Sequence, residues 1–157
     1  MKVIFLNPEG ALNCDNTLPF CNDYMGIDKD KVERLKEIVD ATGAKIVLIS
    51  PWKDGWMPGR QYQPNRYPFA AYLDDNLLKY GNLTIFDKTH EMVASDRGMG
   101  IKAWIEMYPD ITHWIVLDNR QAKDYIKFKI VPDHLILTDC DLGLTPENVA
   151  AAISLLT

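Results

Sequence analysis

Polar residues that can bind cations or anions stand at or just beyond the ends of short apolar segments of the chain. They are Asn7 and Glu9 after the first segment, Ser50 after the second, and Asp118 with Asn119 after the third. If these segments are strands of one parallel sheet, a ligand site is expected outside their carboxyl ends. Whether these residues lie close together therefore depends on the secondary structure that the chain forms.

The apolar segments are short and nearly continuous, which is typical of strands covered on both faces. They run from Val3 to Leu6, Ile46 to Ile49, Trp114 to Leu117 and Leu135 to Leu137. Helical patterns lie between them, the clearest over Lys29 to Thr42, where Gly43 supplies a C-terminal stop. Further helices are expected at about 70–80, at about 98–108 and from Pro146 on, and an edge strand at 83–86.

This alternation predicts an α/β fold, a doubly wound parallel sheet with helices on both faces. The length of 157 residues and the hydrophobic content of 47% favour one domain over residues 1–157 and exclude disordered or collagen-like chains. No apolar stretch is long enough to span a membrane, and the start of the chain lacks the features of a signal peptide. We therefore expect no membrane association and a cytoplasmic location.

The charge balance restricts the partners. The chain has 17 basic and 22 acidic residues and a net charge of -5, which argues against a surface that binds nucleic acid generally. A local basic pocket is compatible with this balance. The 3 cysteines show no CxxC spacing, so neither a disulfide framework nor a zinc site is indicated.

The segment from Pro51 to Phe69 interrupts the alternation. It contains four prolines, two tryptophans and two tyrosines, and reads as a long ordered loop or minimal cap. Its aromatic side chains have two possible roles. They could stack on a base or sugar, or they could pin the loop to the core of the domain, and the second role is favoured.

Five motifs follow one another in a fixed order. They are FLNPEGALN at 5–13, IVLISPWK at 46–53, RG at 97–98 with Ile101 and Trp104, IVLDN at 115–119, and LTD with GLT at 137–145. Together they resemble the haloacid-dehalogenase-like (HAD) phosphohydrolase superfamily, and most closely the small HAD domains of "Swiss Army Knife" RNA-repair proteins. Those domains open with a pattern like hFLDhDGVLN, where h is apolar. The resemblance covers nearly the whole chain and implies a HAD-like fold.

The resemblance also implies roles for Asn7 and Glu9. In the family, the first aspartate of this motif attacks a phosphoryl group, and the second protonates the leaving group and then activates water. Asn7 holds the position of the nucleophile, and Glu9 holds that of the acid/base. A carboxamide cannot form the acyl phosphate, and the extra methylene of Glu9 displaces its carboxylate. We therefore expect impaired catalysis.

Other site positions match the family. By resemblance, Ser50 donates a hydrogen bond to the phosphoryl group, and Arg97 clamps phosphate through the bidentate fork of its guanidinium. Lys53 is a further phosphate-binding candidate, and Lys88 is a rival to both basic residues. The alternative roles are a plain turn serine for Ser50 and a solvated surface arginine for Arg97.

The resemblance implies a Mg²⁺ ion held by the Asp118 carboxylate, because Mg²⁺ prefers oxygen ligands. Asn119 replaces the second acid of that motif, and Asn7 can offer only its amide oxygen. The set Asp118, Asn7 and Asn119 has thus lost formal charge at two positions. Weak Mg²⁺ binding is the expectation.

Three functions follow from these observations. The first is a degenerate HAD-like domain that binds a small phosphorylated ligand, a nucleotide or a nucleic-acid end, with little turnover. The second is an active Mg²⁺-dependent phosphatase or nucleotidase that uses another carboxylate, with Asp15 and Asp139 as the nearest candidates. The third is a non-catalytic scaffold that contacts a protein partner. The first is favoured.

Overall fold

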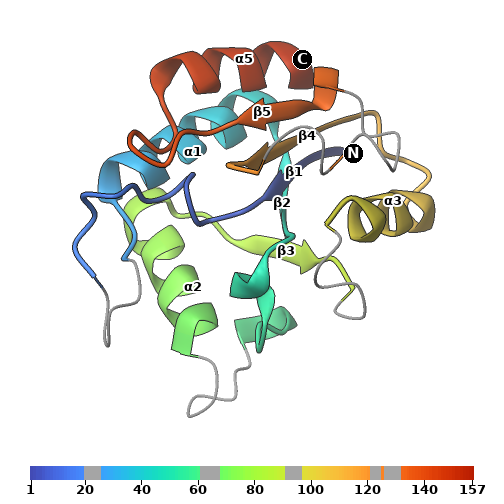
Figure 1. The fold of residues 1–157 in the computed structure, drawn as a ribbon. Helices are drawn as coiled ribbons and strands as arrows, with labels where there is room; N and C mark the ends of the chain where they lie inside the picture. The colour runs from blue at the N-terminus through green and yellow to red at the C-terminus, as the bar shows by residue number, and fades with distance from the viewer. Residues whose placement is uncertain (20–25, 61–67, 91–96, 121–124, 126–131) are drawn as a thin grey trace.

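A five-stranded parallel sheet forms the centre of the molecule (Figure 1). The computed structural model describes residues 1–19, 26–60, 68–90, 97–120, 125 and 132–157. The strands are β1 (Lys2–Leu6), β2 (Lys45–Leu48), β3 (Ile85–Lys88), β4 (His113–Asp118) and β5 (Leu135–Leu137), and they lie in the order β3-β2-β1-β4-β5. Every neighbouring pair is parallel. The predicted doubly wound α/β fold is confirmed.

Helices cover both faces of this sheet, as Figure 1 shows. They are α1 (Lys29–Thr42), α2 (Pro68–Gly81), α3 (Arg97–Met107) and α5 (Pro146–Leu156), with the short 3₁₀ helices η1 (Pro51–Lys53), η2 (Pro58–Arg60) and η4 (Pro132–His134). The helices α1, α2 and α5 share one core with the sheet, while α3 packs on the opposite face. No helix within the described ranges is long and apolar enough to cross a membrane.

The starts of α2 and of the edge strand differ from the sequence-based expectation by two residues each. Helix α2 begins at Pro68 rather than near residue 70, which is consistent with the preference of proline for the first turn of a helix. The edge strand begins at Ile85 rather than at Leu83. Leu83 is buried between α2 and the sheet, and its backbone N–H donates to the Leu77 carbonyl at the end of α2. It therefore belongs to the helix end and not to the strand.

The side-chain alternation along the central strands decides which groups face α3. On β1, Ile4 and Leu6 face the core of α1, α2 and α5, and Val3 and Phe5 face the core of α3. Since successive strand residues point to opposite faces, the next residue, Asn7, falls on the α3 side. Val116 of β4 also faces α3, so Asp118 falls on that side too.

The aromatic residues at the start of the segment 51–69 are part of the core. Trp52 and Trp56 are buried with α1 and α2, and the Trp56 indole N–H donates to the Asp74 carboxylate of α2 over 3.2–3.3 Å. The favoured role, pinning the segment to the domain, is confirmed for this stretch. The expected single loop instead contains η1 and η2, while residues 61–67 lie outside the described part of the chain.

The loop after β1 packs tightly against the loop after β4. Gly10 has a left-handed backbone, with a φ of 79°, and a Cβ atom added there would meet Asn119 Nδ2 at 2.6 Å. Its backbone N–H donates to the buried side chain of Asn13 over 2.8 Å. Any side chain at residue 10 would therefore push apart the two loops that carry the candidate site.

We predict that Gly10→Ala destabilises the protein more than Gly43→Ala does. Gly43 has a similar φ of 71°, but a Cβ there meets nothing within 4 Å. Gly43→Ala therefore measures only the free-energy cost of placing alanine in a left-handed backbone conformation. That cost is about 1–2 kcal/mol. The clash with Asn119 should add about 1–3 kcal/mol at residue 10, as overpacking typically does. Urea unfolding measures the difference, and equal losses would show that the two loops are not tightly packed.

Candidate functional site

The candidate site lies where the order of the strands reverses. The chain builds outward from β1 through β2 to β3, and then returns to place β4 on the other side of β1. Ligands of doubly wound folds bind outside the carboxyl ends of the strands at such a point. Asn7 is the first residue after β1, and Asp118 is the last residue of β4. The structure thus brings these two predicted residues together.

Asp118 is fully buried, so its charge needs hydrogen-bond donors from the protein itself. Arg97, the first residue of α3, places its Nη1 2.8 Å from Oδ1 and 2.6 Å from Oδ2. The Tyr125 hydroxyl donates to Oδ2, Asn7 Nδ2 donates to Oδ1 over 2.8 Å, and the Arg120 backbone N–H donates to Oδ1 over 3.2 Å. A carboxylate has about four lone-pair positions, so these contacts use its whole capacity.

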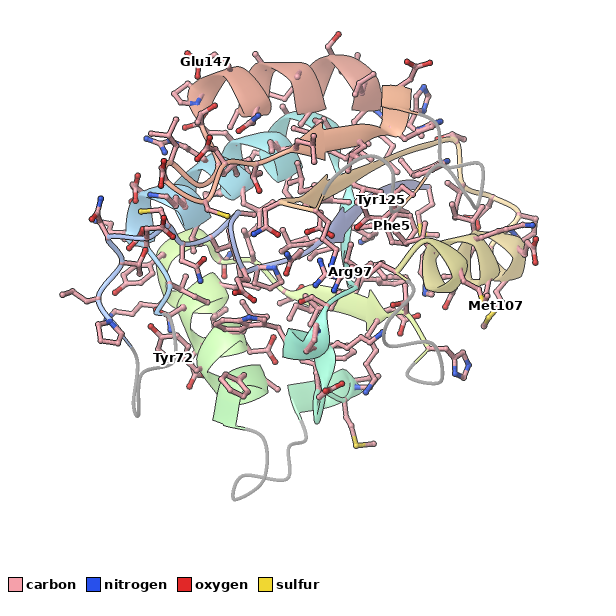
Figure 2. All side chains as sticks on the ribbon, in the orientation of Figure 1. Phe5, Tyr72, Arg97, Met107, Tyr125 and Glu147 are labelled. Atoms are coloured by element: carbon pink, nitrogen blue, oxygen red, sulfur yellow. The ribbon has the colours of Figure 1, made fainter. Side chains whose placement is uncertain are left out.

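Tyr125 is the residue of this network that the sequence motifs did not indicate. Its side chain is buried in the core shared with α3, and Figure 2 shows it near Arg97 in the middle of the molecule. Burial raises the pKa of the Tyr125 phenol well above its ordinary value, and the nearby charge of Asp118 and the hydrogen bond to it add to the shift. Tyr125 therefore keeps its proton and remains a donor to Asp118.

The orientation of Asn7 follows from the carboxylate beside it. A carboxylate can only accept hydrogen bonds, so Asn7 turns its Nδ2 toward Asp118. Nδ2 donates to Asp118 Oδ1 over 2.8 Å and to Asn119 Oδ1 over 3.1 Å. Its Oδ1 accepts from the Glu9 backbone N–H over 3.2 Å. The amide thus acts as a donor toward the centre of the site. The side chain of Glu9 is exposed at the rim.

Ser50 lies at the end of the neighbouring strand β2. The register pairs Leu48 with Leu6 of β1, and the Ile49 backbone N–H donates to the Leu6 carbonyl over 3.2 Å. Ser50 and Asn7 therefore follow adjacent strand ends, which are about 4.8 Å apart in such a sheet. Ser50 is 1% exposed, yet within the described structure its Oγ has no hydrogen-bond partner. A buried hydroxyl left without a partner is costly, and a bound ligand can satisfy it.

Arg97 is a buried residue, not the solvated surface arginine of the alternative reading. It is 8% exposed and forms an ion pair with Asp118, and within the described structure its Nε has no hydrogen-bond partner.

Lys53 is a second buried cation at this edge of the sheet. Lys53 Nζ donates to Thr89 Oγ1 over 2.9 Å and to the His90 carbonyl over 3.1 Å. Thr89 lies against Gly100 of α3, which places Lys53 beside the start of that helix.

The remaining candidates occupy other positions. Lys88, the rival phosphate ligand, approaches the Lys53 carbonyl with its Nζ at 3.5 Å. Asp15 and Asp139 are exposed and form an acidic surface cluster with Asp141, whose pKa is raised by a hydrogen bond with Asp15 and by the charges of Asp139 and Asp15. Asp139 Oδ1 accepts from the Asp141 backbone N–H over 2.7 Å, which is a turn role. None of these contacts joins the Asp118 network.

The predicted Mg²⁺ ligands do not form a metal site in this arrangement. Asp118 Oδ1 accepts from a guanidinium, an amide and a backbone N–H, Oδ2 accepts from the same guanidinium and a phenol, and Asn7 turns its nitrogen toward the centre. Asn119 Oδ1 accepts from Asn7. Among the residues that the structure describes, no cluster of three or more His, Cys, Asp or Glu side chains is placed to hold a metal. The donor set therefore suits a cation already present, Arg97, and not Mg²⁺.

We predict that the stability of the protein falls as the pH rises above about 10, and that Tyr125→Phe removes part of this fall. The phenol has a raised pKa in the folded protein, so above its ordinary value near 10 the unfolded chain loses the proton while the folded chain keeps it. The contribution of the Tyr125 phenol to the free energy of unfolding is complete below pH 10 and is lost as the pH rises further. For one such group the slope reaches about 1.4 kcal/mol per pH unit.

Urea unfolding at pH 7 and at several values above pH 10 measures this for both proteins. All other tyrosines and lysines are common to the pair, so the difference in slope belongs to Tyr125. At pH 7 the variant should also be less stable by about 1–3 kcal/mol, because Asp118 loses a donor. Parallel pH profiles would contradict the buried hydrogen bond.

Comparison with known protein families supports the relationship that the motifs suggest. Residues 3–149 match the family described as "HAD domain in Swiss Army Knife RNA repair proteins". Comparisons with curated proteins and with solved structures gave no match. The family match covers β1 from Val3 on, all of the other four strands, and the first residues of the last helix, α5. The chain therefore belongs to the HAD domains of Swiss Army Knife RNA repair proteins.

Proposed function

We propose that this protein is a HAD-like domain that binds a phosphorylated ligand and turns it over slowly, if at all. The family connects the chain with phosphoester chemistry in RNA repair. The local chemistry of the site narrows this to the recognition of a phosphate group. The ligand class that fits is a phosphomonoester, in a nucleotide or at a nucleic-acid end.

The observation that carries this proposal is the unpartnered, buried hydroxyl of Ser50, which follows the strand end adjacent to that of Asn7. Ser50 Oγ and Arg97 Nε are both buried, and neither has a partner in the described structure. A phosphate group carries several acceptor oxygens that can satisfy buried donors of this kind, and such charge-assisted hydrogen bonds are stronger than neutral ones. Lys53 adds a second buried positive charge at the same edge of the sheet.

Slow turnover follows from the groups at positions 7 and 9. Asn7 has no nucleophilic carboxylate, and its amide nitrogen faces Asp118. The Glu9 side chain is exposed and is one methylene longer than the aspartate of the family pattern. Position 7 therefore contributes a hydrogen-bond donor in place of an attacking oxygen.

Recognition of a single end agrees with the charge of the chain. A net charge of -5 opposes binding along a nucleic-acid backbone, whereas a terminal phosphate requires only a local pocket. An oligoribonucleotide with a terminal phosphate should therefore bind, and the same oligonucleotide with a hydroxyl end should not.

We predict that Ser50→Ala weakens phosphate binding without destabilising the free protein. A hydrogen bond to a charged group contributes about 1.5–3 kcal/mol, so the affinity for inorganic phosphate should fall by about tenfold or more. Since Ser50 Oγ has no partner in the described structure, its removal should leave the unfolding temperature unchanged or slightly higher. Calorimetric titration with phosphate and thermal unfolding measure the two effects.

Ser154→Ala is the matched control, because Ser154 is exposed on α5, away from the strand ends. It should change neither quantity. A structural role for Ser50 would give the opposite pattern, with a lower unfolding temperature and unaltered phosphate affinity. If neither phosphate nor a phosphate-ended oligoribonucleotide binds the parent protein, the non-catalytic scaffold becomes the better interpretation.

Restoring the acids of the family pattern tests the proposed loss of catalysis. The double variant Asn7→Asp, Glu9→Asp should release phosphate from a chromogenic phosphomonoester in the presence of Mg²⁺, and the parent protein should release it at least about a hundredfold more slowly. Asp118→Asn in the double-variant background controls for contaminating phosphatases. Equal rates in the parent and the double variant would contradict the proposal.

A further inference from the structure

The carboxylate that the family pattern assigns to a metal has another cation as its partner. Arg97 Nη1 contacts both oxygens of Asp118, and the pair is buried, with Arg97 8% exposed and Asp118 0% exposed. The Tyr125 phenol and the Asn7 amide complete the shell of donors. The carboxylate is therefore fully compensated by the protein chain alone.

The charges around this network favour an anion as the next ligand. Arg97 and Asp118 form a buried ion pair whose two charges balance each other. With asparagine at positions 7 and 119, this chain lacks carboxylates that the family pattern has there and that a metal would balance. An anion entering here meets the Arg97 guanidinium, and the one buried carboxylate is already covered by donors.

Arg97 can serve Asp118 and a ligand at the same time. A guanidinium has five N–H donors in a fixed plane, and the contacts to Asp118 use only Nη1. Nε is buried and has no partner in the described structure. The ion pair fixes the plane of the guanidinium, so a donor aimed away from Asp118 is already oriented before a ligand arrives.

We propose that Arg97, held in place by Asp118, Tyr125 and Asn7, supplies the positive charge that a metal would otherwise provide, so that this site binds phosphate without Mg²⁺. The inference rests on the proposed function and deepens it, because it assigns the source of the charge. In this arrangement Asp118 is a positioning residue for Arg97. The asparagine at position 7 stabilises this arrangement, because an aspartate there would face the buried carboxylate of Asp118.

Titration calorimetry with inorganic phosphate, once in EDTA and once in excess Mg²⁺, tests this directly. The dissociation constants should agree within about twofold in the two buffers. Arg97→Gln should weaken binding at least about tenfold, while Lys102→Gln, which removes an exposed charge from the same helix, should leave it unchanged. Should Arg97→Gln fail to fold, Arg97→Lys keeps the charge and loses the planar fork, and should still weaken binding severalfold.

The outcomes separate this inference from the proposed function. Binding that requires Mg²⁺ overturns the inference and leaves phosphate recognition intact. Binding in EDTA that survives Arg97→Gln overturns the role of Arg97. No binding in either buffer overturns the proposed function, and this inference with it.

Asn7→Asp gives the converse test with a nearly isosteric change. It places a second carboxylate where Nδ2 now lies 2.8 Å from Asp118 Oδ1. Like charges at that separation repel each other and an incoming anion, so phosphate affinity in EDTA should fall at least about tenfold. Mg²⁺ should restore it, because two facing carboxylates form a metal site. Unchanged affinity of the variant in EDTA would show that residue 7 does not set the metal requirement.

Discussion

The buried charge of Asp118 is the constraint on which this site depends. A carboxylate removed from water is very unfavourable unless every lone pair has a donor, and breaking a buried ion pair costs about 3–5 kcal/mol. The chain meets this demand with Arg97 at the start of α3, with Asn7 directly after β1 and with Tyr125, seven residues after Asp118. Parts of the chain far apart in sequence are thereby held at one point of the sheet edge.

The architecture explains why these groups can meet. The reversal of strand order places β1 and β4 side by side, and the alternation along both strands turns Asn7 and Asp118 toward α3. The close approach of Gly10 to Asn119 keeps the two following loops in contact. The chain thus combines the parallel sheet of a HAD domain with asparagine at residues 7 and 119.

The asparagine at residue 7 and the ion pair between Arg97 and Asp118 are physically connected. With asparagine at residue 7, a donor replaces an acid beside Asp118, and the network closes without a metal. In the proposed function, Asn7 also stands where the family pattern has the nucleophile, so the compensation of the buried charge and the proposed loss of turnover have one physical origin. In the described structure, the buried groups of this site that are left without a hydrogen-bond partner are the Ser50 hydroxyl and Arg97 Nε.

The sequence alone predicted the parallel sheet, its helices and the gathering of Asn7, Ser50 and Asp118, because apolar periodicity and strand ends are local properties. It also places asparagine where the family resemblance implies the nucleophile, since residue identity is read directly. Only the tertiary structure paired Arg97 with Asp118 and brought in Tyr125, which no motif marks. Ion pairs between residues 21 positions apart depend on how α3 packs against the sheet, and that packing is decided by the whole core.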